Sequence, residues 1–398
     1  MKVHKSQIRV ITGNSAAAHG AMLCRPDVVT SYPITPMSEV AEQLSSFHAD
    51  GIMDAEMVEV EGENSAMNVV AAASAAGGRV FTASSSWGLV YMYDALLQAA
   101  GYRAPVVMAI ANRETPGILG VSSGQQDIIA TRDSGWIQII VENCQEILDQ
   151  IIMAFRLAED CDIQLPVMVN YDGFYLSYLA EAVDIPAIED VDKFLAPLKQ
   201  QPERPKLIPG EPLGCGTHGI DAGFSELRYK HCAALLRALD KVDEIDKDFG
   251  EHFGRSYGGQ IEEYRTEDAE IVILTSGGAA GTTRTVIDTK REEGIKVGLV
   301  KLRLFRPFPA KRLVQALKGK KAVGVIDRSI CYGWDCGPFC MELKTLYPEI
   351  GSIPILSYID GLANMDITIP HIERVVDEVH AAAQGKPYQK LTWIPLEE

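Results

Sequence analysis

The chain has 398 residues, of which 47% are apolar and 23% are charged, which is enough material for more than one globular core. Its 37 basic and 54 acidic residues give a formal net charge of −17, and a surface of that sign repels nucleic acid. Because no run approaches the roughly 20 apolar residues of a membrane span and the first residues do not resemble a signal peptide, we expect a cytoplasmic protein without membrane or nucleic-acid partners.

The first half of the chain alternates short β-branched runs with longer apolar stretches at helical spacing. This pattern predicts a parallel sheet with helices on both faces, in the α/β class. Residues 64–76 (NSAMNVVAAASAA) are nearly all small, and predict a helix that is buried on every side. Strands are expected at 28–31, 57–60, 79–82, 106–110, 137–141 and 167–171, and further helical patterns at 92–100, 145–153 and 154–159.

A proline-rich segment, SYPITP, follows the first of these strands. Pro33 ends the strand, because proline fixes its own φ and keeps the preceding residue out of the helical region. Two interpretations of the next residues stay open. Pro36 suits the first position of a helix with Thr35 as its N-cap. Alternatively, the Thr35 hydroxyl faces a ligand, since open α/β sheets bind ligands at the carboxyl ends of their strands.

Charged side chains follow two further strands. Glu59, Glu61 and Glu63 precede the small-residue helix, where a carboxylate can bind a protonatable ring nitrogen or simply favour the positive helix end. Arg113 closes the segment Ala-Asn-Arg after the strand VVMAI. Its planar guanidinium can hold a substrate carboxylate through two hydrogen bonds, or it pairs with a surface acid or a helix-end carbonyl.

The character of the chain changes near residue 185. Residues 198–222 are rich in proline and glycine and predict a long connector, and 224–249 have the pattern of one charged amphipathic helix. The turn TSGGAAGT at 275–282 is similar to a phosphate-binding loop, but we favour a purely steric role for its glycines. The expected parts are a catalytic domain over 1–185, a connector over 186–266 and a second α/β domain over 267–398.

Eight cysteines are present, and five of them are scattered, as expected for reduced thiols in the interior. The other three, Cys331, Cys336 and Cys340, form a C-x4-C-x3-C run that fits no standard iron–sulfur spacing. We interpret them as thiols in a strand-to-helix turn and expect neither a metal nor a cluster in this chain. Their role stays open.

Several motifs resemble one known family in their order along the chain. The segments SYPITP, VEGENSAM, RVFTASSSWGL, ANR and TRDSGWIQ, followed by EYRTEDAE and LRLFRPFP, are similar to the α subunit of the thiamine-diphosphate-dependent 2-oxoacid:ferredoxin oxidoreductases. Pyruvate oxidoreductase is the best-known member. The resemblance covers most of the chain. It implies a thiamine-diphosphate-binding domain of the pyrimidine type, then a transketolase C-terminal-like domain, and CoA-dependent oxidative decarboxylation of a 2-oxoacid.

The resemblance also implies roles for individual residues. Glu63 matches the glutamate that hydrogen-bonds N1′ of the cofactor's aminopyrimidine, with Glu61 as the competing candidate. Arg113 matches the arginine that holds the 2-oxoacid carboxylate, and Thr35 the threonine that contacts the substrate. The residues expected to line the cofactor are Thr82, Ser84, Ser85 and Ser86, and those expected to line the substrate pocket are Ile34, Thr35, Arg113, Gly117, Ile118 and Leu119.

The chain has no complete GDG…N segment for the diphosphate and Mg²⁺, and its near match Tyr171-Asp172-Gly173-Phe174 lacks the asparagine. In the resembling family a β subunit supplies the diphosphate and Mg²⁺ sites and a [4Fe-4S] cluster, and ferredoxin-like and CoA-domain γ and δ subunits complete the complex. We therefore expect a subunit that is inactive alone, in a complex that uses CoA and reduces ferredoxin or another acceptor. The alternative is a non-catalytic scaffold subunit of the same fold.

The segment after Arg113, residues 114–126, departs from the family pattern. Glycines and small or aliphatic residues stand where pyruvate-type subunits carry bulkier side chains, which predicts a larger and more apolar pocket. An aromatic 2-oxoacid such as phenylglyoxylate is therefore slightly favoured over pyruvate. The alternative is that the loop has moved and the pocket is unchanged.

Overall fold

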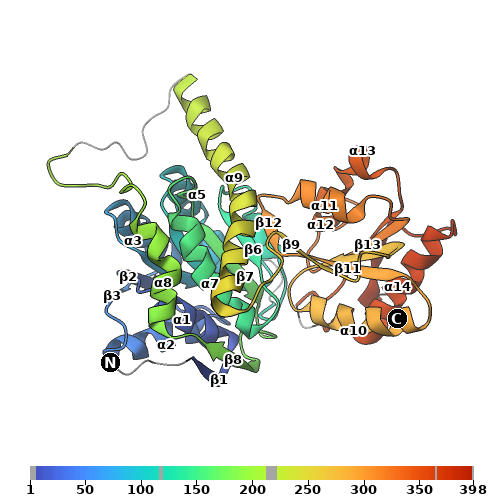
Figure 1. Ribbon diagram of the computed structural model, residues 1–398, viewed down its shortest axis with the longest axis horizontal. Coiled ribbons are helices and arrows are strands. Elements are labelled where there is room, and N and C mark those ends of the chain that lie inside the picture. Colours follow the sequence, from blue (N-terminus) through green and yellow to red (C-terminus); the bar gives the residue numbers. More distant parts are fainter. Residues whose placement is uncertain (1–5, 116–119, 212–221, 364, 397–398) are drawn as a thin grey trace.

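The computed structural model shows two α/β units side by side (Figure 1). It describes residues 6–115, 120–211, 222–363 and 365–396. Within these residues the first unit is built on a seven-stranded sheet in the order β12-β6-β7-β5-β4-β2-β3, and all of its strand pairs except β12–β6 are parallel. Its strands are β2 (Val28–Ser31), β3 (Glu56–Glu59), β4 (Val80–Ser84), β5 (Val106–Asn112), β6 (Ile137–Ile140), β7 (Val167–Asp172) and β12 (Leu304–Arg306).

This sheet is covered on both faces, as predicted from the apolar runs. Successive side chains of a strand point to opposite faces, and β5 is apolar on both. Its residues Val107 and Ala109 share a core with the helices of one face, whereas Val106 and Met108 share a core with those of the other. The first group comprises α1 (Gly13–Leu23), α2 (Ser38–Ala49), α7 (Cys144–Glu159), α8 (Ile188–Lys199) and α9 (Ala222–Phe253), and the second α3 (Glu63–Ala75), α4 (Ser86–Tyr91), α5 (Tyr93–Gly101) and α6 (Gln126–Ala130).

The six predicted strands of this unit are confirmed, with ends displaced by no more than two residues, and the helical patterns at 92–100, 145–153 and 154–159 are confirmed as helix. One prediction, the all-round burial of the small-residue helix, was wrong. The helix α3 is not buried on every side: Met67 and Val70 lie in the core, whereas Asn68 and Ala72 are exposed. The patterns at 145–153 and 154–159 form the single helix α7. The pattern at 92–100 belongs to α5, and a separate short helix, α4, precedes it.

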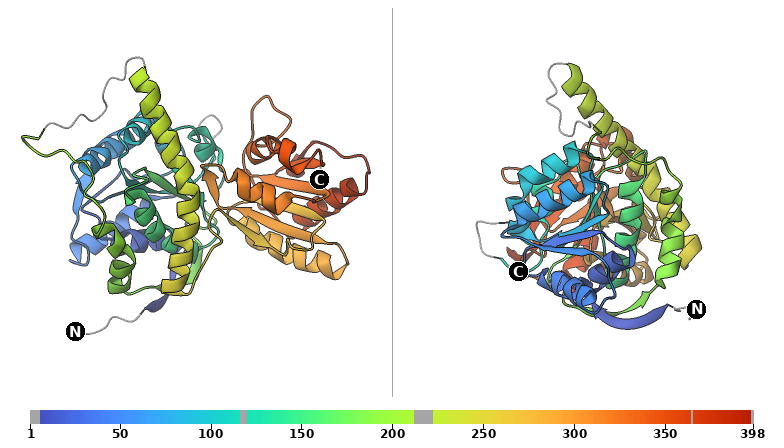
Figure 2. Two further views of the ribbon diagram at one scale, coloured as in Figure 1. Left: turned by 45° about the horizontal axis from the view of Figure 1, so that its top comes forward. Right: turned by 90° about the vertical axis from the view of Figure 1, so that its left-hand side faces the viewer.

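Two elements lie at the margins of the first unit. The strand β1 (Gln7–Thr12) pairs with β8 (Ala180–Ile185) in a separate antiparallel ribbon. The helix α9 runs along the unit, and its first turns project beyond it, where residues 223–230 are exposed (Figure 2). Among the described helices, none combines the length and apolar character that crossing a bilayer requires.

The second unit contains, within the described residues, a six-stranded sheet in the order β15-β14-β13-β10-β11-β9. Its helices α10 (Ala279–Glu292) and α14 (Ile369–Ala383) share a core on one face, and α11 (Ala310–Leu317) and α12 (Pro338–Lys344) cover the other. The remaining elements are β9 (Ile261–Tyr264), β10 (Ile271–Thr275), β11 (Val297–Leu302), β13 (Ala322–Asp327), β14 (Ile355–Ile359), β15 (Leu391–Trp393), α13 (Tyr347–Ile350) and η1 (Ile394–Leu396).

The two units are joined by one shared strand and by buried charges. The strand β12 belongs by sequence to the second half but pairs with β6 of the first sheet. Beside it, Lys301 contacts Glu142 at 2.7 Å and Glu146 at 2.8 Å, and Arg303 contacts Glu146 at 2.7 Å. The expected parts at 1–185, 186–266 and 267–398 remain a proposal for the domain boundaries, because β9 and β12 both contribute to a sheet outside the part that contains them.

Candidate functional site

The carboxyl ends of parallel strands meet at one edge of a sheet, which brings together the segments after β2, β3, β4 and β5. At this edge lies a cavity of about 570 Å³. Its wall combines aromatic and aliphatic side chains with one acid and one guanidinium. The lining residues are Tyr32, Pro33, Ile34, Glu63, Trp87, Val90, Tyr91 and Arg113.

Glu63 is the first residue of α3, and its side chain is brought to the cavity by the close approach of α4. Only 9% of Glu63 is exposed. A Cβ atom at Gly88 would lie 2.6 Å from Glu63 Oε1 and 2.5 Å from Ser84 Oγ, so glycine is required for α4 to pack here. Glu61, the competing candidate, is exposed and accepts a hydrogen bond of 2.6 Å from Ser65. The geometry therefore favours Glu63 over Glu61.

Arg113 directly follows β5 and is almost fully buried. Its Nη1 donates to the Thr35 carbonyl at 2.9 Å, and its Nε donates to the Gly120 carbonyl at 2.6 Å. Burial lowers the pKa of this guanidinium, and the Asp127 carboxylate opposes that shift. The arginine is thus fixed by two neighbouring loops while its side chain lines the cavity.

The N-cap prediction for Thr35 was wrong. The helix α2 begins at Ser38, with Met37 at the preceding position, because a turn closed by the Met37 amide and the Ile34 carbonyl at 2.8 Å comes first. Asn14 fixes this turn by donating to the Pro36 carbonyl at 2.7 Å. Thr35 is exposed and is not among the residues that line the cavity, although its neighbour Ile34 is; its carbonyl accepts the hydrogen bond from Arg113. The substrate contact expected of its hydroxyl stays a prediction.

The serine-rich segment after β4 carries buried hydroxyl groups. Thr82 and Ser84 point to the same face of β4, since they are two residues apart. Within the described residues, the hydroxyls of Thr82, Ser84 and Ser85 have no hydrogen-bond partner. Ser86 begins α4, and its hydroxyl donates to the Glu114 carbonyl. Because buried polar groups are almost always paired, three unpaired hydroxyls are candidates for contacts to polar atoms of a ligand. Thr82, Ser84, Ser85 and Ser86 are fully buried and are not among the residues that line the cavity, so their expected role at the cofactor stays a prediction.

Asp127 on α6 joins the segments of Ser86 and Arg113, and no sequence pattern marks it. Its fully buried carboxylate accepts from the amides of Ser86 at 3.1 Å, Arg113 at 3.0 Å and Ile128 at 2.8 Å, and from Asn112 Nδ2 at 3.2 Å. Burial raises its pKa to about 7, although these donors oppose the shift. Asp127 thereby ties the start of α4 to the segment of Arg113.

Trp87 and Tyr91 are further wall residues that the sequence reasoning missed. They lie on α4, a helix too short to show a periodic pattern. The predicted pocket residues Gly117, Ile118 and Leu119 lie outside the described residues. The predicted widening of the pocket by this loop therefore stays a prediction.

The glycine-rich turn at 275–282 has a structural partner. The Gly278 amide, next to the start of α10, donates to Asp172 Oδ2 at 2.8 Å, and Arg328 contacts the same oxygen at 2.8 Å. A carboxylate of the first unit thus occupies the position at the helix start that a phosphate would take. Asp172 belongs to the near match YDGF, so this acid joins the two units.

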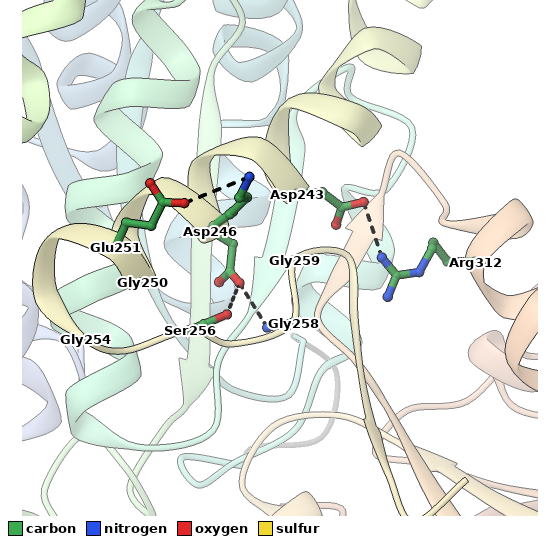
Figure 3. A pocket seen from close by; sticks show the side chains of 10 residues that line it. Asp243, Asp246, Gly250, Glu251, Gly254, Ser256, Gly258, Gly259 and Arg312 are labelled. Carbon is green, nitrogen blue, oxygen red and sulfur yellow. Dashed lines mark hydrogen bonds and ion pairs between the residues drawn. The ribbon is translucent and has the colours of Figure 1, made fainter. Parts of the chain in front are cut away.

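A second hollow, of about 500 Å³, lies at the end of α9 (Figure 3). Its acids are paired: Asp246 accepts from Ser256 Oγ at 2.6 Å and from the Gly258 amide at 3.1 Å, and Asp243 contacts Arg312 at 3.3 Å. These contacts fasten the turn that leads into β9. Because its polar groups satisfy one another, this hollow is a weaker candidate than the cavity of Glu63.

Within the described part of the chain, Cys331, Cys336 and Cys340 belong to no group of side chains whose atoms could meet on one metal ion.

Comparison with known proteins gives a consistent result. A family model described as pyruvate flavodoxin/ferredoxin oxidoreductase, thiamine diphosphate-binding, matches residues 19–247, and pyruvate:ferredoxin oxidoreductase core domain II matches residues 269–372. The α subunit of NADH-dependent phenylglyoxylate dehydrogenase from Aromatoleum evansii is 41% identical over 96% of this chain and 93% of its own length. Pyruvate synthase subunit PorA from Methanothermobacter thermautotrophicus is 42% identical over 98% and 99%, respectively.

Solved structures share the fold. The 2-oxoglutarate:ferredoxin oxidoreductase from Magnetococcus marinus superposes with a TM-score of 0.74 and 22% identity, over 95% of this chain and 65% of that longer chain. A split-gene transketolase, an inactive β4 tetramer, gives a TM-score of 0.53 at 11% identity. The two-unit α/β architecture predicted from the sequence is therefore confirmed.

Proposed function

The chain belongs to the pyruvate flavodoxin/ferredoxin oxidoreductase family, and from this membership we propose that its cavity holds a 2-oxoacid beside the aminopyrimidine part of thiamine diphosphate. It is an α subunit of a multi-subunit 2-oxoacid oxidoreductase that depends on this cofactor. The observation that carries the proposal is the convergence of Glu63 and Arg113 on one largely apolar cavity. The acid suits a ring nitrogen and the guanidinium suits a carboxylate.

The residues at the cavity fit the cofactor's aminopyrimidine. The buried hydroxyls of Thr82, Ser84 and Ser85 have no partner within the described residues, and Glu63 lines the cavity, where its carboxylate can meet a ring nitrogen. When bound, thiamine diphosphate supplies a carbon nucleophile and an electron sink for decarboxylation. Glu63 would hold a proton at the pyrimidine nitrogen, and the serine segment would orient the ring.

Arg113 would position the substrate. Its guanidinium is held by the Thr35 and Gly120 carbonyls, so it is already oriented before a carboxylate binds. Because the arginine is already ordered, substrate binding does not have to overcome the entropic cost of ordering a flexible side chain. Thr35 would contact the substrate from the neighbouring loop. Asp127 would hold the start of α4 and the Arg113 segment in fixed positions relative to each other.

The substrate is a 2-oxoacid, and we favour an aromatic acid such as phenylglyoxylate slightly over pyruvate. The described wall supports this choice, because Tyr32, Trp87 and Tyr91 offer aromatic surface and Ile34 and Val90 offer aliphatic surface. The relatives carry both names at nearly equal identity, so their sequences do not separate the two substrates.

The complete reaction needs partner subunits. We propose a β subunit that supplies the diphosphate and Mg²⁺ sites and a [4Fe-4S] cluster, together with ferredoxin-like and CoA-domain subunits. The released electrons pass to ferredoxin or another acceptor, and the acyl group passes to CoA. The seven described cysteines are free thiols, which suits a reducing cytoplasm.

The test uses the complex purified from its native host through a tag on this chain. Reduction of a viologen dye with CoA is compared for phenylglyoxylate, indolepyruvate, branched-chain 2-oxoacids, 2-oxoglutarate and pyruvate. We expect the highest kcat/KM with an aryl acid. Preference for pyruvate would refute the proposed substrate and leave the family function intact. A complex with bound thiamine diphosphate and iron that turns over none of these acids would favour the scaffold alternative.

Substitution of Arg113 tests the carboxylate contact separately. Arg113→Ala is expected to raise the substrate KM by roughly 10- to 100-fold, because a charge-assisted pair of hydrogen bonds is lost. Arg113→Lys keeps the charge but not the planar geometry, so its KM should lie between those of the unsubstituted protein and Arg113→Ala. An unchanged KM in Arg113→Ala would show that another group binds the carboxylate.

A further inference from the structure

Trp87 is a large aromatic residue in the wall of the cavity that Glu63 and Arg113 share. It lies on α4, which follows β4, and β4 pairs in the first sheet with β5, the strand that Arg113 follows. Trp87 is 46% exposed, so almost half of its surface is available for a further contact. A tryptophan that borders a cavity in this way offers a flat apolar surface to a ligand.

The residue before Trp87 is bound to the segment of Arg113. The Ser86 amide donates to Asp127 Oδ2 at 3.1 Å, and the Arg113 amide donates to the same oxygen at 3.0 Å. The Ser86 hydroxyl donates to the carbonyl of Glu114, the residue after Arg113. Ser86 has a φ of 39°, which residues with a Cβ atom rarely adopt, so these bonds and not the preference of the chain fix its position.

The residue after Trp87 packs against Glu63. A Cβ atom at Gly88 would lie 2.6 Å from Glu63 Oε1 and 2.7 Å from Glu63 Cγ, so the backbone of α4 lies directly beside this side chain. Trp87 therefore stands between a residue that is bound to the Arg113 segment and a residue that touches Glu63. We expect a molecule that reaches from one of these polar groups to the other to meet the indole.

The other two aromatic residues of the wall are placed differently. Tyr91 lies one turn further along α4 and beside Gly62 at the start of α3, where a Cβ atom would be 3.4 Å from Tyr91 Cε1. Tyr32 follows β2, which lies on the other side of β4 from β5. Trp87 is thus the aromatic wall residue whose neighbour in the chain is bound to the Arg113 segment.

We propose that Trp87 selects for an aryl group on the 2-oxoacid by stacking against its ring. The inference rests on the proposed function, in which Arg113 holds the substrate carboxylate. With the carboxylate bound there, a phenyl group on the oxo carbon can lie against the indole, whereas the methyl group of pyruvate offers it little surface. Trp87 takes part in no covalent step, and it acts by contact with the bound substrate alone.

Kinetics of the purified complex test this role. Trp87→Leu should lower kcat/KM for phenylglyoxylate by roughly three- to tenfold and change that for pyruvate by less than about twofold, because stacking is lost while the wall stays apolar. Trp87→Phe keeps a ring, so its kcat/KM for phenylglyoxylate should lie between those of Trp87→Leu and the unsubstituted complex. Equal losses for both acids, or no loss for phenylglyoxylate, would refute the proposal.

Trp334→Leu is the matched control. Trp334 is a tryptophan of the second unit that is 65% exposed and is not among the residues that line the cavity. Its substitution should leave kcat/KM unchanged for both acids. A loss in Trp334→Leu as selective for phenylglyoxylate as the loss in Trp87→Leu would mean that the discrimination does not arise at the cavity, and the proposal would fall.

A binding measurement keeps this inference distinct from the proposed function. Phenylacetate has the carboxylate and the ring but no 2-oxo group, so it can bind without reacting. Because a ring stacked on an indole changes its emission, phenylacetate should alter the tryptophan fluorescence of the complex, and Trp87→Phe should lose this signal while Trp334→Phe keeps it. Acetate should give no comparable change.

The two readouts separate the possible failures. If the unsubstituted complex preferred pyruvate but showed the signal that depends on Trp87, the proposed substrate would be wrong and the aryl contact would stand. If the complex preferred phenylglyoxylate and Trp87→Phe kept the full signal, the proposed function would stand and the role of Trp87 would be refuted.

Discussion

Two fully buried carboxylates of the first unit, Asp127 and Glu146, have opposite electrostatic surroundings. Burial opposes the ionisation of Glu146, but Lys301 and Arg303 outweigh it and lower its pKa to about 2. Asp127 receives hydrogen bonds only from amide groups, and burial raises its pKa to about 7. Glu146 is part of an ion-pair cluster at the junction of the units, and Asp127 is bound by the amides of Ser86 and Arg113 near the cavity that Arg113 lines.

The two regions also differ in how completely their polar groups are paired. At the junction, Lys301 contacts three carboxylates, those of Glu142, Glu146 and Glu262. In the segment after β4, the hydroxyls of Ser84 and Ser85 have no partner within the described residues. Buried groups that satisfy one another fix a structure, whereas buried groups left without partners indicate where a ligand belongs.

The largest expected effect tests the cavity. Glu63→Gln keeps the size of the side chain but cannot accept and return a proton, so turnover by the complex should fall by roughly 100- to 10,000-fold with little change in the melting temperature. The matched control is Glu61→Gln at the exposed neighbouring acid. Steady-state kinetics of both variants decide the assignment, and a larger loss in Glu61→Gln would reverse it.

The second prediction tests the junction. Lys301→Met removes the cation shared by the buried acids and should lower the free energy of unfolding by about 3–5 kcal/mol. Denaturant unfolding of the purified chain measures this loss. Lys193→Met, which breaks an exposed pair with Asp190, is the control and should cause no resolvable change. If both variants were equally stable, the junction would not depend on its ion pairs.

The strands, and the meeting of Glu63 and Arg113 at one cavity, could be predicted because their signals are local. β-branched runs mark the strands, Arg113 directly follows β5, and Glu63 begins the helix that follows β3. The exposed face of α3 was missed because its composition resembles that of a buried helix, and only the packing around it decides which side is covered.

Contacts between segments that are distant along the chain could not be predicted from the sequence. Asp127 accepts from an amide 41 residues away, at Ser86, and β12 pairs with a strand more than 160 residues earlier. The prediction of Thr35 as a helix N-cap failed for a related reason, because the turn that precedes α2 is fixed by Asn14 on another helix. Each of these features depends on tertiary packing and has no local pattern.

The pH dependence of stability offers a finer test of the two acids. The pKa of Asp127 is raised in the folded state, so its stabilising contribution is complete below about pH 4 and is lost as the pH rises through about 7. Glu146 has a lowered pKa, so its contribution is present above about pH 4.5 and is lost as the pH falls toward 2.

Asp127→Asn should therefore flatten the fall in unfolding free energy between about pH 4 and 7, by up to about 1.4 kcal/mol per pH unit. The buried carboxyls of Glu114 and Asp327, whose pKa values burial raises to about 7 and about 8, add slopes of the same sign in both proteins. The acid limb set by Glu146 should not change. Unfolding curves across pH would contradict this assignment if the variant kept the full slope.

The smallest expected change in stability comes from single hydroxyl groups, and it compares a paired hydroxyl directly with an unpaired one. Ser84→Ala removes a buried hydroxyl that has no partner among the described residues, so the isolated chain should be equally stable or gain up to about 1 kcal/mol. Ser256→Ala removes a hydroxyl that donates to Asp246 at 2.6 Å and should cost about 1–2 kcal/mol. In the complex the order should reverse for cofactor binding: Ser84→Ala should weaken thiamine diphosphate several-fold, while Ser256→Ala should leave its affinity unchanged. A loss of stability in the isolated Ser84→Ala chain would mean that this hydroxyl serves the fold, and the unpaired groups at the cavity would then no longer support a ligand site.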